Sequence, residues 1–338
     1  MGRLKAGLTA LGLAGLAGIA PPAAAQDFYK GKTITIIVGF SSGGGFDIVA
    51  RLLSRHLGLH VPGKPDVVIT NMPGAASLTG MQYLDTIAPR DGTFLDTFNF
   101  GLIADSRIFP ERVKADLRKY AWIGSVNQDI SACYTWGSLG LKTLDQVRAR
   151  PEVHMGDVGP GTSAFVGQNI LKNIFGVNIK QVLGYPGSAE QRIAIERGEL
   201  DGDCGAWVSL PADWIDGKKV NPLMRTAPIL APGMPPDVPY MADIAPDDKS
   251  SKIIELLTGS GQLGRPFIAA SSVPEERLAI LRKAFDETMR DPEFLADAAK
   301  IRHPVAPKNA SEALKIVENI YSTPDNIVSP ARVIAGGL

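Results

Sequence analysis

Between Thr33 and Leu57 the chain reads TITIIVGFSSGGGFDIVARLLSRHL. The β-branched run from Ile34 to Val38 is typical of a buried strand. From Val49 to Leu57 the apolar residues recur three and four positions apart, which predicts an amphipathic helix with one apolar face. The stretch therefore predicts a strand, a glycine-rich turn and a helix in direct succession.

The turn between this strand and this helix reads SSGGG, from Ser41 to Gly45. Glycines let the backbone bring several N–H groups together at the start of the helix, where the helix dipole favours an anion. The turn contains no Lys or Arg, so backbone dipoles and hydroxyl groups would meet the charge. This pattern fits a small anion held reversibly better than a phosphate held for chemistry.

The N-terminal segment has the parts of a secretory signal peptide. Arg3 and Lys5 precede a short apolar stretch, and three alanines follow it just before Gln26. A membrane anchor is the alternative, but the stretch is short and rich in Gly and Ala, which favours the signal peptide. We therefore expect a signal peptide over residues 1–25, cleaved near Ala25, and an exported mature protein.

Composition excludes one class of partner and sets the size of the fold. The chain has 35 Lys and Arg, 35 Asp and Glu, and 7% aromatic residues, with no basic patch interleaved with aromatics. This balance argues against nucleic acid as a partner. A hydrophobic content of 45% is enough for a full core, and the mature length suits two domains of ordinary size.

A second strand–turn–helix unit follows the first. Residues 67–70 predict a strand, 71–77 a turn rich in small residues and 78–88 a helix, and a third strand is expected at 93–98. This βαβαβ order predicts a parallel sheet with its loops at one edge. Ligands bind such sheets outside the carboxyl ends of the strands, which is where both turns are expected.

The middle of the chain repeats this arrangement. The repeat predicts strands at 153–158, 179–183 and 202–208, a helix at 144–149, a small-residue turn at 159–163, and helices at 164–175 and 189–197. The architecture is therefore expected to be two α/β lobes whose loops face one another. Residues 227–248 are expected to return the chain to the first lobe, ahead of helices at 275–289, 292–301 and 311–322. The last dozen residues show no clear pattern.

The chain has two cysteines, Cys133 and Cys204. An oxidising compartment permits a disulfide between them, but each lies in a strand-like run where a buried thiol is a common filler, so both readings stay open. No metal site is expected. His ligands are missing near the cysteines, and His56 and His60 are separated by Gly58, which is expected to end the helix.

Six motifs along the chain resemble those of the tripartite tricarboxylate transporter receptors, also called Bug or TctC proteins. In the first lobe GFSSGGGFDIVAR (39–51) resembles their PFxxGGxxDxxAR signature, NMPGAASLTG (71–80) their NxPGAxGxxG loop, and PRDGTFL (89–95) their PDGYTL turn. GPGTS (159–163), GYPGSAE (184–190) and GELD (198–201) resemble three motifs of their second lobe. The six occur in the same order at compatible spacing and cover nearly all of the mature chain.

The resemblance implies a receptor rather than an enzyme. It implies an α/β, two-lobe periplasmic binding protein of type II, the Venus-flytrap fold, in the periplasm. Such a receptor captures a small organic carboxylate and delivers it to the membrane permease subunits of a transporter. It needs no cofactor, no metal and no catalytic residue. Lobe I would span residues 26–128, with 233–338 returning to it, and lobe II would span 129–232.

The resemblance also implies which residues contact the ligand. In the family, two loops of lobe I hold a carboxylate through backbone amides and ordered water, and lobe II reads the rest of the ligand. Carried over by motif, the lobe I contacts are Phe40, Ser41, Gly44, Asp47, Asn71, Gly74, Ala75 and Ser77. The lobe II contacts are Thr162, Ser163, Tyr185, Gly187 and Asp201.

Two of these residues have an ordinary structural reading beside the functional one. Asp47 opens a helix, where its commonest role is to cap backbone N–H groups. Asp201 fits a solvated hairpin as well as a ligand contact.

Three departures from the family pattern bear on the ligand. Phe165 stands where many members have His, Pro186 where many have Lys, and Phe46 where a small polar residue is common. All three remove charge or polarity, which favours an aromatic or aliphatic carboxylate over citrate. The alternative is that Phe46 and Phe165 simply pack in the core.

A secreted α/β serine hydrolase is the alternative function. Gly39-Phe40-Ser41-Ser42-Gly43 matches G-x-S-x-G between a strand and a helix, as in a nucleophile elbow. In a hydrolase, however, an earlier strand supplies an oxyanion donor, and here the elbow follows the first strand of the mature chain. A nucleophilic serine also needs an oriented base, and His303 has no recognisable setting for that role. The receptor is therefore the preferred reading.

Overall fold

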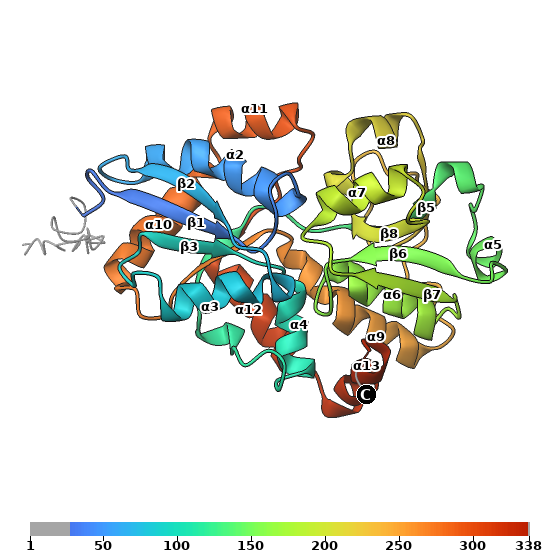
Figure 1. Cartoon of the computed structure of the whole chain (residues 1–338). Coiled ribbons are helices and arrows are strands. Elements are labelled where there is room, and N and C mark those ends of the chain that lie inside the picture. Colours follow the sequence, from blue (N-terminus) through green and yellow to red (C-terminus); the bar gives the residue numbers. More distant parts are fainter. Residues whose placement is uncertain (1–27, 337–338) are drawn as a thin grey trace, which may run out of the picture.

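The computed structural model describes residues 28–336 as two lobes that stand side by side, each built around one β-sheet (Figure 1). Helices cover the sheets, and loops of both lobes meet in the middle of the molecule. The predicted two-lobe α/β architecture is confirmed.

The sheet of lobe I has six strands in the order β11-β4-β10-β3-β1-β2. β1 pairs in parallel with β2 and β3, as the βαβαβ pattern predicted, whereas β10 runs antiparallel between β3 and β4. The sheet is therefore mixed rather than purely parallel. The strands are β1 (Thr33–Val38), β2 (Asp66–Asn71), β3 (Phe94–Thr97), β4 (Ala121–Ser125), β10 (Pro266–Ala269) and β11 (Lys308–Asn309).

Helix α2 (Gly45–His60) packs on β1, β2 and helix α10 with the face that the apolar periodicity predicted. Val49, Leu52, Leu53 and Leu57 are buried on this face, which anchors the start of the helix next to the lobe II loops. The other helices of lobe I are α3 (Leu78–Thr86), α4 (Gly101–Ile108), α10 (Glu275–Thr288), α11 (Pro292–Lys300) and α12 (Ala310–Tyr321).

The sheet of lobe II has five strands in the order β7-β6-β8-β5-β9. β6 is parallel to β7 and β8, and β5 is antiparallel to β8 and β9. The strands are β5 (Ser131–Trp136), β6 (Val153–Asp157), β7 (Ile179–Leu183), β8 (Gly202–Ala206) and β9 (Val220–Arg225). The helices are α5 (Leu144–Arg148), α6 (Ser163–Asn173), α7 (Ser188–Glu196) and α8 (Ala212–Asp216).

A disulfide joins Cys133 and Cys204, which closes the question that the sequence left open. The two residues face each other in the antiparallel pairing of β5 with β8, and both are buried under α6. The bond therefore links two central strands of lobe II.

Two helices lie where the lobes meet. Helix α9 (Asp248–Thr258) and helix α13 (Asp325–Ile334) pack on each other, and both contact α4 of lobe I and α6 of lobe II. Helix α13 occupies the C-terminal stretch for which no element was predicted, because Pro330 in its interior masks the helical pattern. Since these helices contact both lobes, the lobe boundaries drawn at residues 129 and 233 stay a proposal.

The predicted signal peptide lies outside the described residues. Within residues 28–336, no helix is both long and apolar enough to cross a membrane.

Candidate functional site

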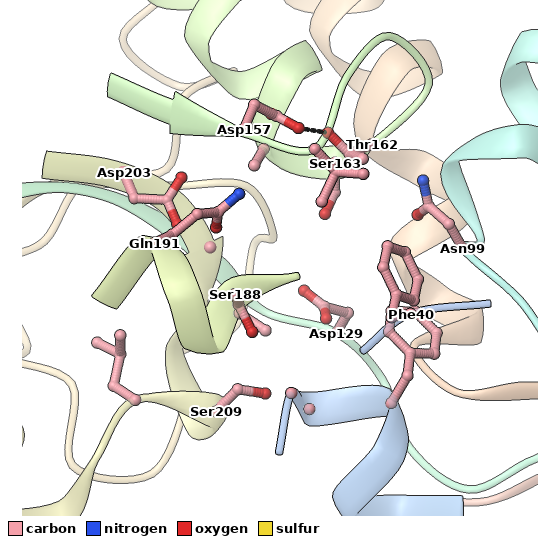
Figure 2. Close-up of a pocket in the computed structure, with 18 of the residues that line it drawn as sticks. Phe40, Asn99, Asp129, Asp157, Thr162, Ser163, Ser188, Gln191, Asp203 and Ser209 are labelled. Atoms are coloured by element: carbon pink, nitrogen blue, oxygen red, sulfur yellow. Dashed lines mark hydrogen bonds between the residues drawn. The ribbon is translucent and has the colours of Figure 1, made fainter. Parts of the chain in front are cut away.

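A cavity of about 90 Å³ lies between the lobes, at the carboxyl ends of the strands (Figure 2). Lobe I contributes the loop after β1, the start of α2 and Asn99 after β3. Lobe II contributes residues from β6, β8 and the starts of α6 and α7. This is the place predicted from the topology, because ligands of such sheets bind beyond the carboxyl ends of the strands.

The start of helix α2 forms one wall of the cavity, through Gly44, Gly45 and Phe46. The first N–H groups of a helix have no partner within the helix. The N-cap residue is Gly44, which has no side chain that could accept hydrogen bonds from these groups. These N–H groups and the helix dipole therefore give this wall a positive potential.

Asp47 stabilises the glycine-rich turn from outside the cavity. Its carboxylate accepts hydrogen bonds from the Gly43 N–H (2.9 Å), the Arg51 side chain (2.9 Å) and the Asn71 side chain (2.9 Å). Burial would raise the pKa of Asp47, but these hydrogen bonds outweigh it and hold the pKa below its usual value. Asp47 thus accepts a hydrogen bond from a backbone N–H of the turn, in agreement with the capping role predicted from the sequence.

Two helices of lobe II also begin at the cavity. Ser188 opens α7 and lines the cavity directly. Thr162 caps α6, because its hydroxyl accepts the Phe165 N–H at 3.0 Å, and it donates to the Asp157 carboxyl at 2.5 Å, the dashed contact in Figure 2.

Direct contacts hold the lobes together beside the cavity. The Ser41 hydroxyl donates to the Glu190 carboxylate at 3.1 Å, and the Ser41 N–H donates to the Pro186 carbonyl at 3.3 Å. The Arg192 guanidinium donates to the Gly43 carbonyl at 3.1 Å. The molecule is therefore in a closed arrangement, with the glycine-rich turn of lobe I resting on the start of α7.

Arg265 is the most connected residue of the cavity wall. Its guanidinium pairs with Asp129 at 2.9 Å, donates to the Ser209 hydroxyl at 3.0 Å, and stands 4.4 Å from the centre of the Phe46 ring. Phe46 in turn stacks on Phe40, with ring centres 4.9 Å apart. Arg265 thus ties the start of β10 to both lobes. It was not predicted from the sequence, because an isolated Arg carries no motif.

Two carboxyl groups on the lobe II side were also missed. Asp157 and Asp203 line the cavity, and Figure 2 shows them across from Phe40 and Asn99. Burial, reinforced by repulsion from Asp203, raises the pKa of Asp157 to about 8. Burial raises the pKa of Asp203 to about 7, although the Cys204 N–H and Arg192 oppose the rise.

Four of the thirteen predicted contact residues line the cavity: Phe40, Gly44, Thr162 and Ser163. Ser41 and Gly187 meet at the contact between the lobes, where a Cβ on Gly187 would lie 2.4 Å from the Ser41 hydroxyl. Asn71 supports the turn by donating to the Phe40 carbonyl at 2.9 Å.

The remaining predicted residues lie farther out. Gly74, Ala75 and Ser77 form a tight turn, and the Ser77 hydroxyl accepts the N–H of the cavity residue Asn99 at 2.9 Å. Asp201 binds Arg150 (2.9 Å) and the His154 N–H (2.8 Å) instead of facing the cavity. Tyr185, among the described residues, is likewise not part of the cavity lining. The assignment of ligand contacts stays a proposal.

The two phenylalanines that replace polar residues have different places. Phe46 lines the cavity. Phe165, within residues 28–336, is absent from the lining and packs near Gly336 at the C-terminal end. Pro186 offers its carbonyl to Ser41. Of the three replaced positions, only Phe46 of lobe I lines the cavity, and Asp157 and Asp203 give the lobe II side polar groups.

The geometry gives no support to a serine nucleophile at Ser41. Its hydroxyl binds a carboxylate, and none of the four histidines, all within the described residues, lines the cavity. They pair elsewhere: His56 with Asp297, His60 with Asp291, His154 with Glu152 and His303 with Asn127. Within residues 28–336, no group of three or more His, Cys, Asp or Glu side chains is placed to hold a metal ion.

Comparison with known proteins gives one relative by sequence. A UPF0065 protein of Bordetella pertussis (strain Tohama I) is 29% identical over 188 residues, which are 54% of this chain and 57% of that protein. The match thus spans just over half of the relative's length. No protein-family model matches the chain.

Solved structures share the fold over nearly the whole chain. Periplasmic binding protein BugD is similar at a TM-score of 0.72 and 18% identity, over 90% of this chain and 98% of its own. Two proteins from Rhodopseudomonas palustris, MatC with bound malate and Rpa4515 with adipate, give TM-scores of 0.68 and 0.70, both at 18% identity. Each match covers 90% of this chain, with 99% of MatC and 97% of the adipate protein.

The chain is thus similar in sequence to a UPF0065 protein and shares the fold of periplasmic binding protein BugD. The resemblance stated from six sequence motifs is thereby confirmed, and so is the periplasmic-binding-protein fold that it implied.

Proposed function

We propose that the protein is an extracytoplasmic solute-binding receptor that captures a small organic carboxylate between its two lobes. The observation that carries the proposal is the cavity itself, which both lobes line and which borders the start of α2, where the N-cap residue offers no side-chain acceptor. Malate and adipate, the ligands of two proteins of the same fold, are both carboxylates.

The carboxylate would lie at the start of α2. Backbone N–H groups there can donate to it, and the Arg192 guanidinium, which lines the cavity and contacts the Gly43 carbonyl, adds a positive charge nearby. The α2 dipole favours an anion at this end of the helix. The stacked rings of Phe40 and Phe46 offer an apolar surface to the carbon skeleton.

Binding would favour the closed arrangement of the lobes. A ligand that contacts both lobes stabilises the closed state relative to the open one, by its difference in affinity for the two. The contacts of Ser41 with Glu190 and of Arg192 with Gly43 form only when the lobes are together. We propose that the closed, loaded receptor is the form that the membrane permease subunits of a transporter recognise, in the periplasm after cleavage near Ala25.

A thermal-shift screen of carboxylic acids, followed by calorimetry and an ester-hydrolysis assay, tests the proposal. A ligand at 100 times its Kd should stabilise the protein by about 2.7 kcal/mol. We expect at least one monocarboxylate or dicarboxylate to stabilise the protein and bind one to one, without ester turnover. The proposal is wrong if no carboxylate binds, and ester hydrolysis that disappears in Ser41→Ala would support the hydrolase instead.

A further inference from the structure

The lobe II wall of the cavity carries two buried carboxyl groups. Asp157 ends strand β6 and Asp203 lies in the neighbouring strand β8. Asp157 is 0% exposed and Asp203 is 4% exposed, yet both line the cavity, where Figure 2 shows them with Gln191 on one side of the open space. Two carboxyl groups, which accept hydrogen bonds when ionised, therefore form part of the polar surface on this side.

Asp157 has one oxygen that the protein does not use. Its Oδ1 accepts hydrogen bonds from the Thr162 hydroxyl (2.5 Å) and the Gly159 N–H (2.9 Å). Its Oδ2 is buried and, among residues 28–336, has no hydrogen-bond partner. A buried polar atom without a partner costs free energy, which a hydrogen-bond donor in the cavity would recover. The unpartnered oxygen therefore points to a donor on the ligand.

Both positive side chains of the cavity, Arg192 and Arg265, already have partners in the protein. Arg265 is paired with Asp129 at 2.9 Å, so this pair contributes little net charge. Arg192 reaches the Gly43 carbonyl of lobe I, which places its guanidinium on the α2 side. The α2 N-terminus thus lies at one part of the cavity and the two carboxyl groups at another, and Arg192 contacts the first and acts electrostatically on Asp203 of the second.

We propose that the ligand is a small amino carboxylate whose protonated amine binds Asp157 and Asp203, while its carboxylate lies at the start of α2. This inference rests on the proposed function and adds the second group of the ligand. It replaces the aromatic or aliphatic body expected from the sequence, because Phe165 lies away from the cavity lining in the part of the chain that the structure describes.

Among ligands of equal size, the chemical group that binds Asp157 and Asp203 should determine the order of affinity. An ammonium group donates hydrogen bonds and carries the charge opposite to the two carboxylates. A hydroxyl donates one hydrogen bond without charge, and a methyl group leaves Asp157 Oδ2 unpaired. A second carboxylate meets like charge and should be rejected, as citrate should be. Sites built to hydrogen-bond a ligand group discriminate strongly against analogues that lack it.

The pH dependence gives an independent signature. The pKa of Asp157 is raised to about 8 and that of Asp203 to about 7. An ammonium group binds the ionised forms of both, so the two carboxyl groups must release their protons when it binds. Affinity for the amine should therefore rise from pH 6 to pH 8. A carboxylate bound there would need the protonated forms, and its affinity would fall. The charged and titratable groups that face the pair are Tyr134 of β5, Arg192 of α7 and the Asp129–Arg265 pair.

Calorimetry on the mature protein with matched acids tests the inference. One set is alanine, lactate and propionate, which differ only in an amine, a hydroxyl or a hydrogen. The other is 4-aminobutyrate against succinate, which have equal length and differ in the terminal group. At pH 8 we expect the amino member of at least one set to bind at least tenfold more tightly than its analogues. We expect this preference to shrink at least threefold at pH 6.

Two variants locate the preference. Asp157→Asn and Asp203→Asn keep the shape of the side chain and remove its charge, so each should reduce the amine preference at least tenfold. Asp96→Asn is the matched control, because Asp96 is also a buried acid without a partner among the described residues but lies in lobe I, away from the cavity lining. Circular dichroism checks that each variant is folded.

The possible outcomes distinguish a failure of the amino carboxylate inference from a failure of the proposed receptor function. If hydroxy acids or dicarboxylates bind tightest, or if the amine preference survives in both cavity variants, the amino carboxylate inference is wrong and the carboxylate receptor stands. If neither amino acids nor simple carboxylic acids bind, both are wrong.

Discussion

Arg265 stabilises the cavity wall through a buried ion pair. Its side chain is 2% exposed and that of its partner Asp129 is 3% exposed, and the two lie 2.9 Å apart. If one partner of such a pair is removed, the other charge stays buried without compensation, which is strongly destabilising. Replacing both partners with apolar residues costs far less. The residue therefore matters more for the integrity of the wall than for direct recognition of an anion.

Arg265→Met should lower the free energy of unfolding by about 3–5 kcal/mol, because it leaves the Asp129 carboxylate buried and unpaired. Arg302→Met is the control, since Arg302 pairs with Asp216 at 2.7 Å on the surface and such pairs contribute about 0–1 kcal/mol. Urea denaturation followed by circular dichroism measures both. Equal losses in the two variants would contradict the role given to Arg265.

Asp96 makes stability depend on pH. It is fully buried in β3, and within the described residues neither carboxylate oxygen has a hydrogen-bond partner. Burial, with a smaller effect from Asp85, raises its pKa well above the usual value. Above the pKa of the unfolded state, the native protein then binds more protons than the unfolded chain, so stability falls as the pH rises towards the native pKa.

Asp96→Asn should accordingly raise the free energy of unfolding at pH 8 relative to the wild type. The gain should be smaller at pH 5, where the wild-type carboxyl is already neutral in the folded state. Urea denaturation of both proteins at the two pH values gives the comparison. A gain that is as large at pH 5 as at pH 8 would show that charge is not the cause.

At the scale of elements, the start of α2 must approach lobe II closely. A Cβ on Gly45 would lie 2.2 Å from the Ser209 hydroxyl oxygen and 2.7 Å from Arg265 Nη2. Ser209 belongs to lobe II, so this contact exists only when the lobes are together. Glycine at this position therefore serves closure rather than an unusual backbone conformation.

Gly45→Ala should weaken ligand binding at least tenfold, because the added methyl group opposes closure, while the ligand-free protein stays folded. Gly259→Ala is the control, because a Cβ there meets nothing within 4 Å. Calorimetry with any acid found to bind reports the effect. Unchanged affinity in folded Gly45→Ala would mean that the closed contact is not needed for binding.

The elements also show what local sequence could and could not predict. The strand–turn–helix of β1 and α2 was predicted because the β-branched run of the strand and the three-to-four-residue apolar period of the helix are both local signals. β10 and β11 were missed, since four and two residues carry no period and their place depends on pairing with the distant strand β4. Helix α13 was missed because Pro330 interrupts its pattern.

For the candidate site, the sequence motifs predicted which loops border the cavity but not which acidic side chains line it. Phe40, Gly44, Thr162 and Ser163, which line the cavity, were named because the family motifs that this chain resembles place ligand contacts at these positions. Asp157 and Asp203 belong to strands, and only the tertiary structure shows that their side chains face the space between the lobes. The way in which the two lobes assemble determines which face of a short strand lines the cleft between them.

At the scale of the whole molecule, the two lobes together enclose the cavity. The cavity is lined by both lobes, and the contacts that close it come from loops at the carboxyl ends of both sheets. A ligand bound there can stabilise the closed state, because it bridges surfaces that are apart in an open molecule.

Native mass spectrometry of the protein exported with its natural N-terminus tests whether the two lobes enclose a small organic acid. We predict a mature chain that begins near Gln26 and carries one small organic acid, released when the protein is unfolded and identifiable by its mass. We also expect the same acid to rebind one to one. A protein that carries no small acid, and gains none when carboxylic and amino acids are added at millimolar concentration, would contradict it.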